Sequence, residues 1–92
     1  MIAYNEAVDM EVMEILENCG LKNYSKIANT FGRGVSSGTH LGTDIWPGLN
    51  NLLYAAGPDD SARKVLASVR ELRKTLGKTG VKAFVMPLEE MT

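Results

Sequence analysis

The chain has 92 residues, of which 45% are hydrophobic and 23% charged, and its 10 Lys and Arg against 11 Asp and Glu leave a net charge of −1. This composition is typical of a single small globular domain covering residues 1–92. The balanced charge argues against a nucleic-acid partner, and no apolar run is long enough for membrane insertion.

The first predicted element is a short strand over residues 2–4, interpreted as a clipped edge strand. From Ala7 onward, apolar residues recur at helical spacing, which predicts a helix that ends at Gly20. Glycine tolerates the positive φ at which helices commonly end. The apolar residues of this helix are Val8, Val12, Ile15, Leu16 and Cys19.

Residues 24–31 contain no helix breaker and alternate modestly, which predicts a strand. A glycine-rich segment follows and runs to Pro47-Gly48, with the composition of a loop. A loop of about a dozen residues in so small a domain indicates a functional role. A further strand is predicted over residues 49–56, closed by Gly57-Pro58.

The clearest pattern in the chain predicts a second helix that begins near Asp59 and ends near Leu76. Asp59, Asp60 and Ser61 are residue types that favour a helix N-terminus. The apolar residues of this helix are Ala62, Val65, Leu66, Val69, Leu72 and Leu76. A last strand is predicted over residues 81–86, stopped by Pro87.

The order strand, helix, strand, strand, helix, strand predicts an α+β fold of the ferredoxin-like, split βαβ class. Right-handed crossovers then place both helices on one face of a four-stranded antiparallel sheet. Neighbouring residues such as Leu52 and Leu53 put apolar side chains on both faces of the strands. The face without helices therefore also needs burial, and another copy of the chain is its simplest cover.

Two segments carry a family resemblance. Thr30-Phe31-Gly32-Arg33-Gly34 and Lys82-Ala83-Phe84-Val85-Met86-Pro87-Leu88-Glu89 are similar to the T-loop base and the last strand of PII signal-transduction proteins, also called nitrogen regulatory proteins. The helix over residues 10–17 and the segment Pro58-Asp59-Asp60 resemble the family's two helix regions. The resemblance covers nearly the whole chain and identifies it as a variant with a short T-loop.

The resemblance implies a homotrimer that binds ATP, ADP or AMP in clefts between subunits and signals to a partner protein. By position, the nucleotide-binding residues would be Arg33, Gly34, Gly80 and Lys82, and the loop from Gly34 to Gly48 would touch the partner. Gly34 stands where the family has a Gln that helps to hold Mg²⁺ and 2-oxoglutarate. The loop also lacks the tyrosine that is uridylylated in nitrogen regulators.

His40 and Asp44 are spaced so that both can ligate a divalent metal, although the interpretation of His40 as an exposed loop histidine without a metal is favoured. With His40 as its single histidine, the chain offers no Ser-His-Asp or Cys-His constellation, so we expect a regulatory protein and not an enzyme. Two alternatives remain open: a trimeric metal-binding protein of the divalent-cation tolerance type, and an interaction module without a ligand.

The single cysteine, Cys19, permits no internal disulfide, and its place on the apolar side of the first helix indicates a core residue. The segment from Met1 to Glu6 has neither the basic nor the apolar region of a secretion signal. These two observations predict a cytoplasmic location.

Overall fold

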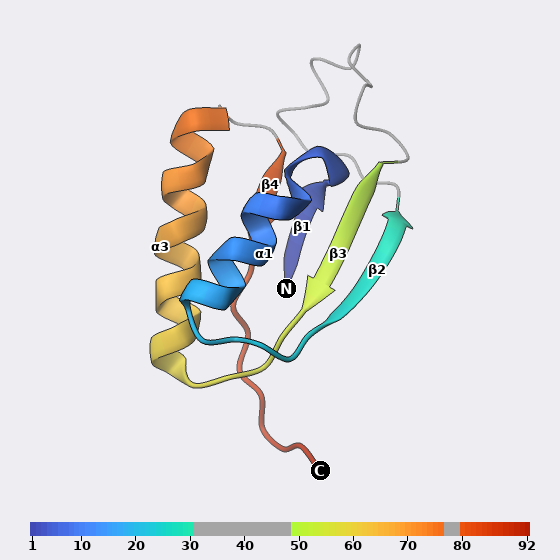
Figure 1. Ribbon diagram of the computed structural model, residues 1–92. Coiled ribbons are helices and arrows are strands. Elements are labelled where there is room, and N and C mark those ends of the chain that lie inside the picture. Colours follow the sequence, from blue (N-terminus) through green and yellow to red (C-terminus); the bar gives the residue numbers. More distant parts are fainter. Residues whose placement is uncertain (31–48, 77–79) are drawn as a thin grey trace.

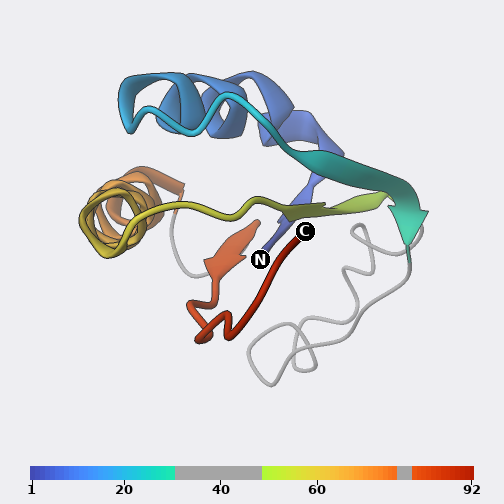
Figure 2. The ribbon, with the colours of Figure 1, turned by 90° about the horizontal axis from the view of Figure 1, so that it is seen from below.

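The computed structural model of the chain describes residues 1–30, 49–76 and 80–92 (Figure 1). Its elements are β1 (Ile2–Asn5), the 3-10 turn η1 (Glu6–Val8), α1 (Asp9–Asn18), β2 (Ser25–Thr30), β3 (Asn50–Tyr54), α3 (Asp59–Leu76) and β4 (Val81–Ala83). Both helices lie on one side of the sheet (Figure 2). The predicted α+β, ferredoxin-like arrangement is confirmed.

The four strands are hydrogen-bonded in the order β2-β3-β1-β4, and every pairing is antiparallel. The interpretation of residues 2–4 as an edge strand is therefore wrong, because β1 lies between β3 and β4. The chain passes from β1 through α1 to β2 at the far edge of the sheet. The positions on both sides of β1 therefore remain free for β3 and β4. The edges of the sheet are β2 and β4.

The helices end and begin where the sequence predicts. Gly20, just beyond α1, has a φ of 78°, which costs glycine little and other residues more. The helix side of the sheet and the inner sides of α1 and α3 form one apolar core, in which Cys19 is buried as expected. The buried hydrophobic residues are Ile2, Tyr4, Val8, Val12, Leu16, Cys19, Leu53, Val65, Val69 and Val81.

The opposite face of the sheet carries no helix and is also apolar. The register aligns Ile27, Leu52 and Ala3 in one row across β2, β3 and β1, and Lys82 of β4 completes this row. Because antiparallel partners share a face, these side chains all point away from the helices. We call this surface the open face; its exposed large residues are Ile27, Tyr54 and Phe84, at 50%, 44% and 40%.

The last strand is shorter than predicted, since β4 ends at Ala83 and not at Met86. Phe84 still exchanges two backbone hydrogen bonds with Met1, at 2.8 and 2.9 Å. The pairing of β4 with β1 ends at Ala83, opposite Ile2, so Val85 and Met86 have the composition of a strand but belong to no strand of the described residues. Both are exposed, at 53% and 60%.

One polar network connects the sheet to α1. The Tyr4 hydroxyl and the Lys26 ammonium both donate to Asp9 Oδ1, at 2.6 and 2.8 Å. The hydrogen bond from Lys26, followed in size by that from Tyr4, holds the pKa of Asp9 below its usual value. Burial and the hydrogen bond to the Asp9 carboxylate raise the pKa of Tyr4. The network ties the edge strand β2 to the helical layer.

Replacing Asp9 by Asn keeps an oxygen for Tyr4 but removes the charge that pairs with Lys26. We expect a loss of about 0.5–1.5 kcal/mol in the free energy of unfolding at pH 7, because the pair is partly exposed. A lowered pKa gives stability that is present above the ordinary Asp value of 3.8 and is lost as the pH falls through the lowered pKa. The difference between wild type and Asp9→Asn should therefore shrink by pH 3, as measured by urea unfolding at one protein concentration.

Glu14→Gln is the matched control, because Glu14 is an exposed carboxylate on the same helix. Its effect should stay within about 0.5 kcal/mol at both pH values. A gap between wild type and Asp9→Asn that stays constant down to pH 3 would contradict the assigned role of the charge.

Candidate functional site

Three segments meet at one end of the sheet, at the upper end in Figure 1. β2 ends at Thr30 and β3 begins at Asn50, and the Thr30 hydroxyl donates to the Asn50 carbonyl oxygen at 3.0 Å. Gly80, just before β4, joins them through β1, because the Asn5 backbone N–H donates to the Gly80 carbonyl oxygen at 2.7 Å. We call Asn5, Thr30, Asn50 and Gly80 the loop end of the sheet. Thr30 and Asn50, which flank the glycine-rich segment, therefore lie at the same end of the sheet as Gly80.

Asn5 holds this end together. Its side chain is buried, and its amide oxygen accepts from the Ala7 N–H at 2.8 Å, which caps the turn η1. In register it pairs with Asn50, while the adjacent Glu6 N–H donates to the Leu49 carbonyl oxygen at 2.7 Å. The sequence reasoning missed Asn5, although an Asn directly before a helical pattern is a known capping signal.

Gly80 and Lys82 are the two predicted nucleotide-binding residues that the structure describes. Gly80 has a φ of 98°, a conformation that side-chain-bearing residues rarely adopt. Lys82 lies two residues further on, exposed on the open face at the edge strand β4. Its Nζ lies 5.9 Å from the centroid of the Phe84 ring, within the range of a cation–π contact.

A second cation that the sequence reasoning did not single out lies near β4. Arg73, in the last turn of α3, donates from Nη1 to the Val81 carbonyl oxygen at 2.6 Å. This bond anchors the start of β4 to α3. It places the Arg73 guanidinium beside Val81, which lies between Gly80 and Lys82 in the sequence. A basic residue in the last helical turn was the available signal, since it also suits the helix dipole.

The other predicted site residues, Arg33, Gly34, His40 and Asp44, lie outside the described residues, as does the predicted loop as far as Gly48. Within residues 1–30, 49–76 and 80–92, no group of three or more His, Cys, Asp or Glu side chains is placed to hold a metal ion. In the same part of the chain, no helix has the length and apolar character needed to cross a membrane.

The loop end combines rigid backbone with a cation at its border. Asn5, Asn50 and Gly80 are fixed by backbone pairing, and Lys82 offers an ammonium and Phe84 an aromatic ring at the edge of the sheet. Such a combination suits a ligand that has both an anionic group and a flat or apolar part.

Comparison with known proteins places this geometry in a wider context. No family model matches the sequence, and no significant match was found among curated proteins. Among solved structures, the chain is similar to CPII, a nitrogen regulatory PII-like protein from Thiomonas intermedia K12 whose structure holds ADP, AMP and bicarbonate. The match covers 88% of this chain and 76% of CPII, with a TM-score of 0.62 and 21% sequence identity. The two chains share a fold, so the fold implied by the resemblance to PII proteins is confirmed.

Replacing Asn5 by Ala should destabilise the protein by about 1–2 kcal/mol, because the cap of η1 is lost at a buried position. The matched control is Asn23→Ala, at an exposed residue between α1 and β2, for which we expect a change within about 0.5 kcal/mol. Thermal or urea unfolding followed by circular dichroism measures both. Equal effects of the two substitutions would show that Asn5 has no special structural role.

Proposed function

We propose that this chain is a PII-like regulatory protein that binds an adenine nucleotide as its effector and carries out no catalysis of its own. The observation that carries the proposal is the fold shared with CPII over 88% of the chain, because CPII is a PII-like protein with ADP and AMP bound. The sequence supports it independently, since the segments that begin at Thr30 and at Lys82 resemble those of PII proteins.

The nucleotide would bind with its phosphates near the loop end of the sheet. Lys82 is the described cation at that edge, and the turn at Gly80 allows a ligand to approach the backbone closely. Arg33 and Gly34 follow Thr30 by only a few residues in the sequence, so we assign them to the same site. The segment from Gly34 to Gly48 would then report the bound nucleotide to a partner protein.

The functional unit would be a homotrimer of single-domain subunits with the open faces packed together. The support is the exposed apolar row on that face, together with a strand β2 that the isolated chain leaves almost entirely exposed. A chain of 92 residues also gains from association, because so small a domain buries a limited fraction of its surface. Three subunits is the number that the resemblance to PII proteins implies.

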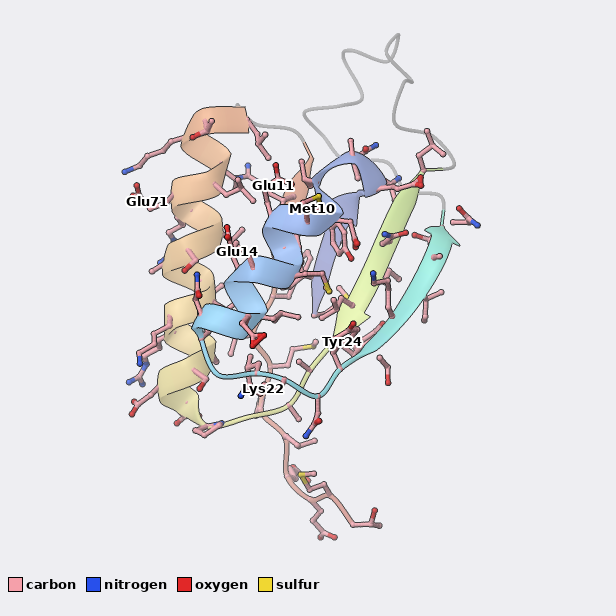
Figure 3. The ribbon with its side chains drawn as sticks, viewed as in Figure 1. Met10, Glu11, Glu14, Lys22, Tyr24 and Glu71 are labelled. Atoms are coloured by element: carbon pink, nitrogen blue, oxygen red, sulfur yellow. The ribbon has the colours of Figure 1, made fainter. Side chains whose placement is uncertain are left out.

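Sedimentation at micromolar concentration should therefore give a mass close to three chains of 10.0 kDa each. Ile27→Asp places a charge in the apolar row of the open face and should shift the protein towards monomer. Met10→Asp is the control, because Met10 is 82% exposed on the outer side of α1 (Figure 3) and should leave the mass unchanged. A wild-type monomer would contradict the proposed assembly.

Calorimetry should detect binding of ATP, ADP or AMP at micromolar or weaker affinity. Lys82→Ala should weaken that binding roughly tenfold to a hundredfold, since a charge-assisted contact contributes about 1.5–3 kcal/mol. The affinity should also fall as salt rises, because partly exposed charges are screened over about 8–10 Å. Lys64→Ala, at an exposed lysine of α3, is the control and should bind as wild type does.

Titrations with bicarbonate, alone and with AMP present, extend the comparison with CPII. Titrations with Zn²⁺ and Cu²⁺ test the divalent-cation alternative that His40 and Asp44 raise. The absence of heat from every nucleotide, or equal affinities in wild type and Lys82→Ala, would remove the proposed nucleotide site.

A further inference from the structure

The edge strand β2 is irregular just before the glycine-rich segment begins. Ile27 pairs with Leu52 of β3. The next pair is Thr30 with Asn50, three residues further along β2 but only two residues back along β3. Two residues of β2 therefore lie opposite one residue of β3, which is the arrangement of a β-bulge. Bulges are frequent at sheet edges and next to functional sites, where they change the direction of a side chain.

Asn29 has the strained backbone conformation of this bulge. Its φ is 58°, and no other non-glycine residue among the described ones has a positive φ. Most side chains disfavour left-handed backbone, and Gly and Asn tolerate it best. The Asn29 side chain is exposed and forms no hydrogen bond or ion pair with the described residues. Asn29 therefore contributes its backbone conformation and not a side-chain contact.

The bulge decides on which face of the sheet the end of β2 lies. Side chains alternate between the two faces along a regular strand, so three steps from Ile27 would bring Thr30 to the helix side. With the extra residue, Thr30 instead shares the face of Ile27, which is the open face. Lys82 lies on the same face.

Side-chain contacts hold β2 on both sides of the bulge. Before it, the Lys26 ammonium donates to Asp9 Oδ1 of α1 at 2.8 Å. After it, the Thr30 hydroxyl donates to the Asn50 carbonyl oxygen at 3.0 Å. Without the bulge but with Lys26 in the same place, Asn29 would lie opposite Asn50. The pairing of Thr30 with Asn50 thus depends on the extra residue.

We propose that Asn29 is a positioning residue for the nucleotide site, because its left-handed backbone brings the end of β2 to the face that carries Lys82. This inference rests on the proposed function. Arg33, which we assign to that site, follows Thr30 by three residues in the sequence, and three residues span at most about 10 Å. The face on which Thr30 lies therefore limits where the Arg33 side chain can reach.

Calorimetry with ADP on a series of variants tests this role. The residues Gly, Asn, Ala and Val at position 29 adopt a positive φ with increasing difficulty, and the affinity falls with the fraction of molecules that keep the bulge. Asn29→Gly should bind within about threefold of wild type, Asn29→Ala more weakly, and Asn29→Val about tenfold more weakly. Asn23→Val is the matched control and should bind as wild type does, because Asn23 is also an exposed Asn but has no positive φ.

NMR measures the strand register in the absence of nucleotide. Cross-strand NOE contacts should join Thr30 to Asn50 in wild type and in Asn29→Gly. In Asn29→Val they should join residue 29 to Asn50. Circular dichroism checks that each variant is folded, and Asn29→Ala carries the comparison if Asn29→Val does not fold.

A double-mutant cycle separates positioning from a general loss of stability. Arg33→Ala should weaken ADP binding in the wild-type background and have little further effect in the Asn29→Val background, because Arg33 no longer reaches the site there. A general loss of stability would leave the effect of Arg33→Ala the same in both backgrounds.

Equal ADP affinities in wild type and Asn29→Val would overturn the role of Asn29 and leave the nucleotide site in place. The same conclusion would follow if Asn29→Gly bound as weakly as Asn29→Val, or if Asn29→Val kept the NOE contacts of wild type. Wild-type protein that binds no nucleotide would remove the proposed function and this role of Asn29 with it.

Discussion

The pairing of β1 with two neighbours is the interaction on which the rest of the structure depends. This four-residue strand joins β3 on one side and β4 on the other, and so connects segments that are about 50 and 80 residues away in the chain. Its inward side chains, Ile2 and Tyr4, are among the most buried in the protein. The bonds of Asn5 shape the loop end, and Met1, just before β1, holds Phe84 by two backbone hydrogen bonds. β1 and the residue before it therefore position the segments at both ends of β4.

The two ends of the sheet differ in chemistry, because polar residues lie at the ends of the strands on one side and apolar residues on the other. At the loop end, the amide side chains of Asn5 and Asn50, the Thr30 hydroxyl and a glycine bring polar groups together. At the opposite end, the strands run into apolar segments that the two helices do not fully cover. Leu16, near the end of α1, borders a cavity, whereas Val12, one turn earlier, is completely buried in the core.

Much of the fold could be predicted because periodicity and turn residues are local signals. The apolar stripes of both helices, the end of the first helix at Gly20 and the order of helices and strands along the chain could all be predicted from the sequence. The central place of β1 could not, because a strand of four residues shows the same pattern at an edge and in the middle of a sheet. Neither could the early end of β4, since Val85 and Met86 have strand composition and the length of the pairing with β1, which stops at Ala83, is set by the folded chain.

The residues of the candidate site also fall into those that the sequence predicts and those that only the structure shows. Lys82 was found because a family motif marks it, and Gly80 because a glycine beside it allows an anion to approach the backbone. Their neighbourhood with Thr30 and Asn50 depends on the central place of β1. Asn5 and Arg73 carry local signals, a capping residue and a basic last helical turn, but their bonds to the Gly80 and Val81 carbonyl oxygens are set by the folded chain. A cavity of about 460 Å³ draws its walls from segments far apart in the sequence, so only the folded chain could bring Leu16, Asp59 and Phe84 to its border.

The position of Lys82 links the proposed assembly to the proposed ligand. It shares a row of the open face with Ala3, Leu52 and Ile27, and a lysine in the middle of a packed apolar interface would pay a large desolvation cost. Because β4 is an edge strand, packing of the open faces would leave Lys82 at the border of the buried surface and not inside it. There the ammonium can keep part of its water or exchange it for a phosphate, with the Phe84 ring beside it. An anion bound at that border would offset the cost of bringing Lys82 close to a second subunit, so that association and nucleotide binding would favour each other.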